Sequence, residues 1–228
     1  MKYKGGTMGW PKLLVLVRHA ESEGNVLSRN ERVKMSTSSH AYKLTERGRK
    51  QAELTGEFLK EKFGTFDAYY VSYYTRSKET MAIIYPEAKT YEDPRLAEGQ
   101  RGMWDTLTDE EMLKKFPEEL ERKKRDGLYH YRAPGGENWS DIELRIHSFL
   151  GTLSRDYEGQ SVLMVIHGHW LTLFEKLVHH FSIEEAVSRY HKATKENASV
   201  TIYEGRTVDG RSRLVLTEEN IVPWKGKI

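Results

Sequence analysis

The chain has 228 residues, of which 38% are hydrophobic and 31% charged, a composition typical of a globular protein with one sizeable domain. Its 36 lysines and arginines against 34 acidic residues give a net charge of +2, which is too balanced to indicate wholesale nucleic-acid binding. The absence of cysteine excludes a disulfide framework, a thiolate zinc site and a cysteine nucleophile.

The N-terminal residues 1–12 lack the apolar core of a signal peptide, and no later stretch is apolar for long enough to span a bilayer. We therefore expect a soluble, cytoplasmic protein. Residues 13–17 follow as an unbroken aliphatic run, typical of a strand buried on both faces.

The rest of the first half alternates helices with strands after a polar, irregular stretch at residues 26–43. Helical spacing of apolar residues predicts a helix over 44–63, with Thr45 as its N-cap. The further predicted elements are strands at 67–72 and 88–92 and a helix at 75–86.

Residues 94–136 are rich in charge and proline, so short helices and loops are expected there rather than a core layer. Ser140 and Glu143 have the spacing of a capping box and predict the start of the next helix. The remaining predicted elements are strands at 161–166, 198–204 and 213–217 and a helix at 169–181.

This alternation predicts a three-layer α/β/α fold with a largely parallel mixed sheet. We expect one domain over residues 1–228, with residues 94–136 inserted as a cap. In such sheets the ligand crevice lies beyond the carboxyl ends of the strands, so residues at those ends are the candidate site residues.

Five chemically active side chains follow predicted strands: Arg18, His19, Arg76, Glu98 and His167. The guanidinium group matches the geometry of a phosphoryl group, and imidazole can act as nucleophile, base or donor near neutral pH. The set therefore predicts phosphate chemistry.

A metal site is the alternative for part of this set, because His19, His167 and Glu98 are ordinary zinc ligands. Two neighbouring arginines would repel the cation. We therefore expect neither a metal nor another cofactor.

Five segments, in this order, resemble the motifs of the histidine phosphatase superfamily, which includes phosphoglycerate mutases and many acid phosphatases. They are RHAESEGN, LTERGRKQA, VSYYTRSKET, DPRLAEG and VIHGHW. The resemblance covers roughly residues 12–204 and implies a phosphoglycerate mutase-like fold. It also implies a phosphohistidine on His19 and proton donation by Glu98. The residues that it implies around the phosphoryl group are Arg18, Arg76, His167, Asn25, Ser22 and Gly168.

The branch of the family is indicated by two segments. The stretch after the first motif lacks the mutase loop with Phe, Thr, Gly and Trp, whereas residues 129–150 resemble a segment of phosphatase-type members. In that segment Tyr131 and Arg132 are candidate substrate contacts. We expect a phosphomonoesterase with an acidic pH optimum, and a cofactor-dependent phosphoglycerate mutase is the alternative.

Two further hypotheses belong to other classes: a catalytically idle phosphoester-binding module, and a regulatory protein that uses residues 99–136 as a partner surface. The expected partner of the enzyme is a small-molecule phosphate ester, with no nucleic acid and no membrane. The physiological substrate and the oligomeric state stay open, because selectivity resides in loops.

Overall fold

The computed structural model describes residues 9–192 and 195–228. The expectation that the chain lacks a signal peptide rests partly on residues 1–8, which lie outside that range. One six-stranded sheet forms the centre, in the order β3-β2-β4-β1-β5-β6. Its strands are β1 (Leu13–Arg18), β2 (Ala68–Val71), β3 (Thr90–Glu92), β4 (Ser161–Ile166), β5 (Val200–Val208) and β6 (Arg211–Ile221).

The sheet is parallel from β3 through β2 and β4 to β1, and antiparallel where β5 and β6 complete it. Every residue of β4 is buried, as a strand covered on both faces requires. The carboxyl ends of β1, β2 and β4 therefore meet at one edge. The predicted fold class, α/β with a largely parallel mixed sheet, is confirmed.

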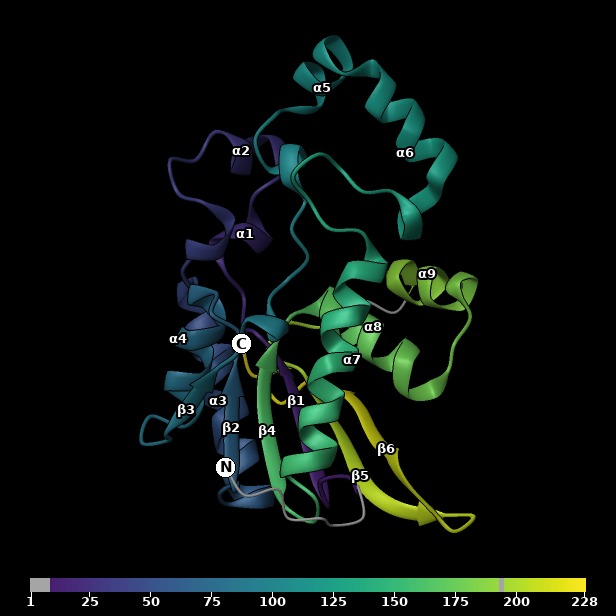
Figure 1. Cartoon of the computed structure of the whole chain (residues 1–228). Coiled ribbons are helices and arrows are strands. Elements are labelled where there is room, and N and C mark those ends of the chain that lie inside the picture. The colour runs from purple at the N-terminus through teal and green to yellow at the C-terminus, as the bar shows by residue number, and fades with distance from the viewer. Residues whose placement is uncertain (1–8, 193–194) are drawn as a thin grey trace.

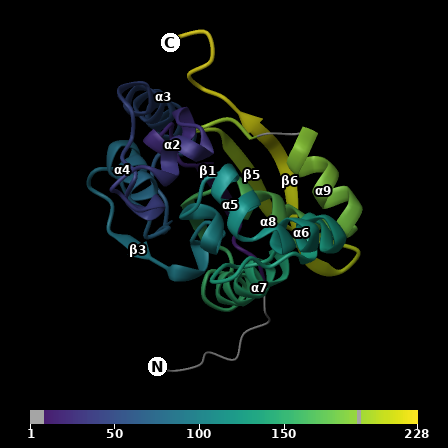
Figure 2. The same ribbon diagram turned by 90° about the horizontal axis from the view of Figure 1, so that it is seen from above.

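Helices cover both faces of the sheet (Figures 1 and 2). On one face α3 and α4 bury Leu59 and Met81 against Val15 and Val165, and on the other α7 and α8 bury Phe149 and Phe174. The helices are α1 (Glu23–Val26), α2 (Arg29–Val33), α3 (Glu46–Phe63), α4 (Thr75–Ile84), α5 (Asp109–Lys115), α6 (Pro117–His130), α7 (Trp139–Asp156), α8 (Gly168–His179) and α9 (Ile183–Lys192). Short 3₁₀ turns are η1 (Ser39–Ala41), η2 (Pro94–Leu96) and η3 (Gly102–Asp105).

One of the two helix caps predicted from the sequence is present in the structure. Thr45 caps α3 as predicted, its hydroxyl accepting from the Gly48 amide at 3.0 Å. The capping box predicted for α7 at Ser140 and Glu143 is wrong. Asn138 and Asp141 form it instead, each side chain accepting from the other's amide at 3.0 Å. Because Asn138 has extended backbone angles, the helix begins two residues earlier than the Ser140 signal implies.

Residues 94–136, which we call the cap segment, stand above the carboxyl edge of the sheet (Figure 1). As predicted, the segment consists of short helices and loops. It has a small core of its own, formed by Trp104, Met112, Tyr131 and Ala133. Over residues 9–192 and 195–228, no helix has the length and apolarity needed to cross a membrane.

Candidate active site

His19 follows the last residue of β1 and is only 3% exposed. Its Nδ1 lies 2.8 Å from the Ala20 carbonyl oxygen, which can only accept, so Nδ1 carries the proton. The lone pair is therefore on Nε2, and the Arg76 Nε–H donates to it at 3.1 Å. The hydrogen-bond partners thus fix the tautomer that presents Nε2 as a nucleophile.

Arg76 joins the ends of three strands. It is the second residue of α4, the helix that follows β2, and its side chain is buried. Besides His19, it contacts His167 Nδ1 through Nη2 at 3.2 Å and the Ser39 carbonyl through Nη1 at 2.9 Å. Its guanidinium carbon lies 4.5 Å from the centre of the Tyr74 ring. One guanidinium group therefore connects both imidazoles.

His167 follows β4 at the N-cap position of α8 and is fully buried. Its ring centre lies 5.2 Å from that of His19. Since Nδ1 accepts from Arg76, the proton is on Nε2, which donates to the Ser72 hydroxyl at 2.8 Å. The amino end of α8 opens at this point, and helix amino ends favour anions.

Arg18 carries a donor without a partner. Its Nη1 donates to the Lys195 carbonyl, but its Nε is buried and makes no hydrogen bond. A Cβ atom on Gly168 would lie 3.3 Å from that Nε, so glycine lets the guanidinium pack against the start of α8. An unpartnered buried N–H is costly unless a ligand satisfies it.

We call these four residues, His19, Arg76, His167 and Arg18, the His19 group, and their electrostatics favour a bound anion. Burial lowers the pKa of Arg18 and Arg76, opposed by the nearby Glu98 carboxylate. Burial first, and then the charge of Arg76, hold the pKa of His19 and His167 well below 6.5. Within the described ranges neither arginine has a carboxylate within 4.0 Å. Two desolvated cations beside two neutral imidazoles would gain from a dianionic phosphoryl group.

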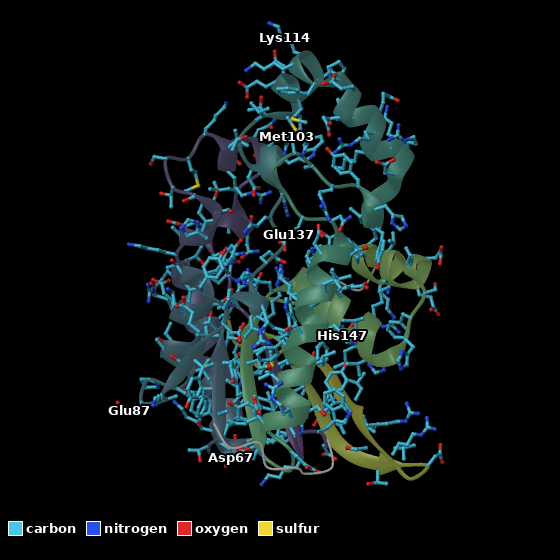
Figure 3. The ribbon with its side chains drawn as sticks, viewed as in Figure 1. Asp67, Glu87, Met103, Lys114, Glu137 and His147 are labelled. Atoms are coloured by element: carbon cyan, nitrogen blue, oxygen red, sulfur yellow. The ribbon has the colours of Figure 1, made fainter. Side chains whose placement is uncertain are left out.

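Glu98 lies half-buried between η2 and η3, and its Oε1 accepts from the Gly99 amide at 3.1 Å. Arg145 of α7 fixes the chain on one side by donating to the Ala97 carbonyl at 2.7 Å. On the other side, the Gln100 amide donates at 3.0 Å to Glu137, which is itself paired with Arg145 at 2.9 Å. Figure 3 shows Glu137 where the cap segment meets the top of α7. The backbone around Glu98 is thereby held from both sides.

Ser22 and Asn25 lie beside the His19 group but bond to each other. The Asn25 Oδ1 accepts from the Ser22 amide at 3.0 Å and from its hydroxyl at 2.9 Å. Asn197 Nδ2 reaches the His19 carbonyl at 3.0 Å and Asn25 Oδ1 at 3.4 Å. This network connects α1 to the residue after β1.

The structure places Tyr131 and Arg132 elsewhere. Tyr131 is buried in the core of the cap segment, where its hydroxyl donates to Glu119 at 2.9 Å and accepts from Trp104 at 3.0 Å. Arg132 pairs with Asp141 at the start of α7. None of their described side-chain hydrogen bonds or ion pairs joins them to the His19 group.

Several contacts were not predicted from the sequence. Ser72 directly follows β2, so the same strand-end argument would have found it. Lys195 and Asn197 act on Arg18 and His19 from a loop before β5, and no sequence signal indicates this. His169, the second residue of α8, packs against Trp139, and its Nε2 is buried with no hydrogen-bond partner among the described residues.

A cavity of about 270 Å³ adjoins the His19 group. Ser39 and Tyr74, which contact Arg76, form one side of it, and Gln100, Gly102 and Gly135 of the cap segment form another. Over the described parts of the chain, no three His, Asp or Glu side chains are arranged to hold a metal ion.

The buried histidines should make the folded protein less stable in acid. The unfolded chain binds a proton on each histidine below pH 6.5, whereas folded His19 and His167 resist protonation, so acidification through this range favours unfolding. Each histidine therefore changes the free energy of unfolding by up to about 1.4 kcal/mol per pH unit. Urea unfolding at pH 7.5 and 5.5 should therefore show a smaller pH dependence for His167→Gln than for the wild type. Equal dependences would contradict the buried, neutral state of His167.

Comparisons with known proteins show the family of the chain. Residues 14–218 match the family model of the histidine phosphatase superfamily (branch 1). Phosphoserine phosphatase 1 of Hydrogenobacter thermophilus is 32% identical over 68% of this chain and 70% of its own length. A phosphoglycerate mutase of Schizosaccharomyces pombe is 31% identical over 71% of this chain and 76% of its own.

Among solved structures, the alpha-ribazole phosphatase of Shigella flexneri superposes with a TM-score of 0.72. The match covers 92% of this chain and 98% of that one at 21% identity, and so it supports the fold. The match to the family model over residues 14–218 and the 32% identity to phosphoserine phosphatase 1 show that the chain belongs to the histidine phosphatase superfamily.

Proposed function

We propose that this histidine phosphatase hydrolyses small phosphate monoesters through a phosphohistidine on His19. The observation that carries the proposal is the unprotonated Nε2 of His19 beside Arg18 and Arg76, two buried cations that have no carboxylate partner among residues 9–192 and 195–228. Phosphatase-named relatives support a phosphoric monoester hydrolase.

In the first step the phosphoryl group enters between the arginines and takes over the Arg76 N–H that now donates to His19. The Nε2 lone pair attacks phosphorus while the bond from phosphorus to the ester oxygen breaks. Glu98 gives its proton to that leaving oxygen. Arg18, Arg76 and the amino end of α8 stabilise the charge that develops on the phosphoryl oxygens.

In the second step water attacks the phosphohistidine, and Glu98, now a carboxylate, accepts a proton from it. The bond from phosphorus to Nε2 breaks, inorganic phosphate leaves, and both residues return to their starting states. We infer that His167, Asn25, Ser22 and Gly168 shape the phosphoryl pocket. For Tyr131 and Arg132 we infer that any effect on substrate is exerted through the cap segment, since their described polar contacts lie within it and with α7.

We further propose a single domain over residues 1–228 with the cap segment above the pocket, acting in the cytoplasm. The absence of cysteine is compatible with a reducing compartment.

A panel assay of phosphate release tests the function and the need for metal together. Sugar phosphates, phosphoglycerates, nucleotides and phosphopeptides are supplied before and after exhaustive chelation. Because the arginines already bring positive charge to the phosphoryl oxygens, turnover of the best substrate should be unchanged by EDTA. Activity lost to EDTA and restored by one divalent ion would contradict metal independence, and no release from any ester would contradict the proposed function.

The second candidate is phosphoglycerate mutase activity, which the similarity to the Schizosaccharomyces pombe enzyme favours. The two activities share a phosphohistidine and differ in its acceptor. Incubation with 3-phosphoglycerate separates them, because a mutase gives 2-phosphoglycerate and a phosphatase gives glycerate and inorganic phosphate.

A further inference from the structure

Arg18 is held in the pocket by fewer contacts than Arg76. Arg76 donates to the Ser39 carbonyl and contacts both imidazoles, so it has several anchors of its own. Among residues 9–192 and 195–228, the Arg18 side chain makes one hydrogen bond, from its Nη1 to the Lys195 carbonyl. The direction of the Arg18 guanidinium therefore depends on how firmly the peptide group that follows Lys195 is held.

That peptide group belongs to residues 195–199, which we call the support loop. The loop also contacts the end of β1 through the backbone. The Ala198 amide donates to the His19 carbonyl at 3.2 Å, and the Arg18 amide donates to the Ser199 carbonyl at 3.0 Å. Whatever fixes the support loop therefore bears on the position of the residues that end β1.

The end of β6 holds the peptide group between Lys195 and Glu196. The Glu196 amide donates to Asn220 Oδ1 at 2.9 Å, and the carbonyl of the same peptide group accepts from Arg18. Two hydrogen bonds on one peptide group polarise it, so that each strengthens the other. Asn220 is thus connected to Arg18 through a single peptide group.

The Lys195 side chain gives the support loop a second anchor on the same strand. It is only 4% exposed, and its ammonium lies 2.8 Å from Glu175 of α8 and pairs with Glu219 of β6. A buried ammonium needs such partners, and the two carboxylates that converge on it fix the residue that carries the carbonyl. Glu219 and Asn220 therefore hold two successive residues of the support loop.

A bulge in β6 makes this double contact possible. The register of β5 against β6 shifts between Val200 and Ile202, so that Glu219 and Asn220 stand where a regular ladder has one residue. Asn220 has a φ of 51°, in the left-handed region. Consecutive residues of a regular strand point to opposite faces, whereas here both side chains reach the support loop. Bulges next to active sites commonly redirect side chains in this way.

An ordinary irregularity of the hairpin is the alternative explanation, and Asp209 at its tip shows what that looks like. Asp209 has almost the same backbone, with a φ of 50°, but its side chain is exposed and forms no hydrogen bond or ion pair within the described chain. Its left-handed backbone serves the turn between β5 and β6. Asn220 differs because its side chain contacts the peptide group that binds Arg18.

We propose that Asn220 and Glu219 are positioning residues, which orient the Arg18 guanidinium through the Lys195–Glu196 peptide group and so set the affinity of the pocket for the phosphoryl group. This inference rests on the proposed function and deepens it. Since neither side chain contacts the His19 group directly, its effect on ligand binding should depend on the presence of the Arg18 guanidinium.

Binding of orthovanadate, a mimic of the phosphoryl group during transfer, measures the pocket without turnover. Asn220→Gly removes the acceptor and retains access to the left-handed backbone, and it should weaken vanadate binding by about three- to tenfold, the usual effect of one lost hydrogen bond. Asn220→Asp keeps an acceptor oxygen and should stay within about twofold of the wild type. Glu219→Gln leaves Glu175 on the ammonium and should weaken binding less than Asn220→Gly. Asp209→Gly is the matched control and should leave binding unchanged.

A double-mutant cycle with Arg18→Ala separates positioning from a general structural role. Once the Arg18 guanidinium is removed, Asn220→Gly should change vanadate affinity by less than about twofold, whereas a structural role would give the full loss in both backgrounds. Full loss in both backgrounds, no loss in the single Asn220→Gly variant, or an equal loss in Asp209→Gly would overturn the proposal. Vanadate binding by a wild type that releases phosphate from no ester would contradict the proposed function instead, and a wild type that binds no vanadate would contradict both.

Discussion

His19→Ala is expected to lower kcat by at least about a thousandfold for every ester that the wild type hydrolyses. The substitution removes the lone pair that forms the bond to phosphorus, and no other imidazole can replace it. His167 is the nearest candidate, but its Nδ1 accepts from Arg76 and its Nε2 donates to Ser72. Its ring centre is also 5.2 Å away, fixed in a fully buried position.

The measurement is a comparison of kcat for wild type, His19→Ala and the control His147→Ala. His147 lies exposed on α7 (Figure 3), so its loss should leave turnover unchanged. Urea unfolding of each variant separates catalytic loss from misfolding. A folded His19→Ala that kept more than about a tenth of the wild-type kcat would show that the nucleophile lies elsewhere.

Glu98→Gln should have an effect that depends on the leaving group. An alkoxide is a poor leaving group and needs a proton as its bond to phosphorus breaks, so loss of the acid should lower kcat for a sugar phosphate by about 10²- to 10⁴-fold. An activated aryl phosphate needs little proton donation, so the substitution should lower kcat for that ester by no more than about tenfold. Glutamine keeps the oxygen that accepts from the Gly99 amide, so the backbone around the site is retained.

The pH profile gives the same prediction a second readout. His19 must be neutral to attack, and burial with the charge of Arg76 lowers its pKa well below 6.5, so the acid limb of the rate should lie well below that pH. A general acid must hold its proton in order to act, so the rate should also have a basic limb, and we expect the optimum on the acidic side of neutrality. In Glu98→Gln the basic limb should disappear for the sugar phosphate, whereas the exposed control Glu87→Gln should retain it. An unchanged basic limb, with equal losses for both esters, would remove Glu98 from this role.

The grouping of the strand-end residues around His19 was predictable, because it follows from where the strands end. The aliphatic run of β1 and the apolar run of β4 are unambiguous, and parallel strands bring Arg18, His19, Arg76 and His167 to one edge. This placement needs no knowledge of side-chain packing. The hydrogen bonds from Arg76 to both imidazoles could not be predicted, since they depend on rotamers set by burial.

The cap segment shows where the sequence argument stops. Tyr131 belongs to a segment that resembles a phosphatase motif, yet its ring packs with Trp104 and Met112, because the cap segment needs an apolar core of its own. A motif identifies the segment but not which of its side chains turn inward. Helix α9 was missed although Ser182 and Glu185 carry a readable capping box, with each side chain accepting from the other's amide.

The most direct test of the account is to trap the enzyme during turnover. Brief reaction of the wild type with a phosphate ester labelled on its phosphoryl group, followed by an alkaline quench and peptide mapping, reports which residue carries the phosphate. The account predicts an acid-labile, alkali-stable phosphate on the peptide that contains His19, absent from His19→Ala and from a sample quenched before the substrate is added. Label on a serine, a carboxylate or another histidine, or turnover at the wild-type rate with no label on the protein, would contradict it.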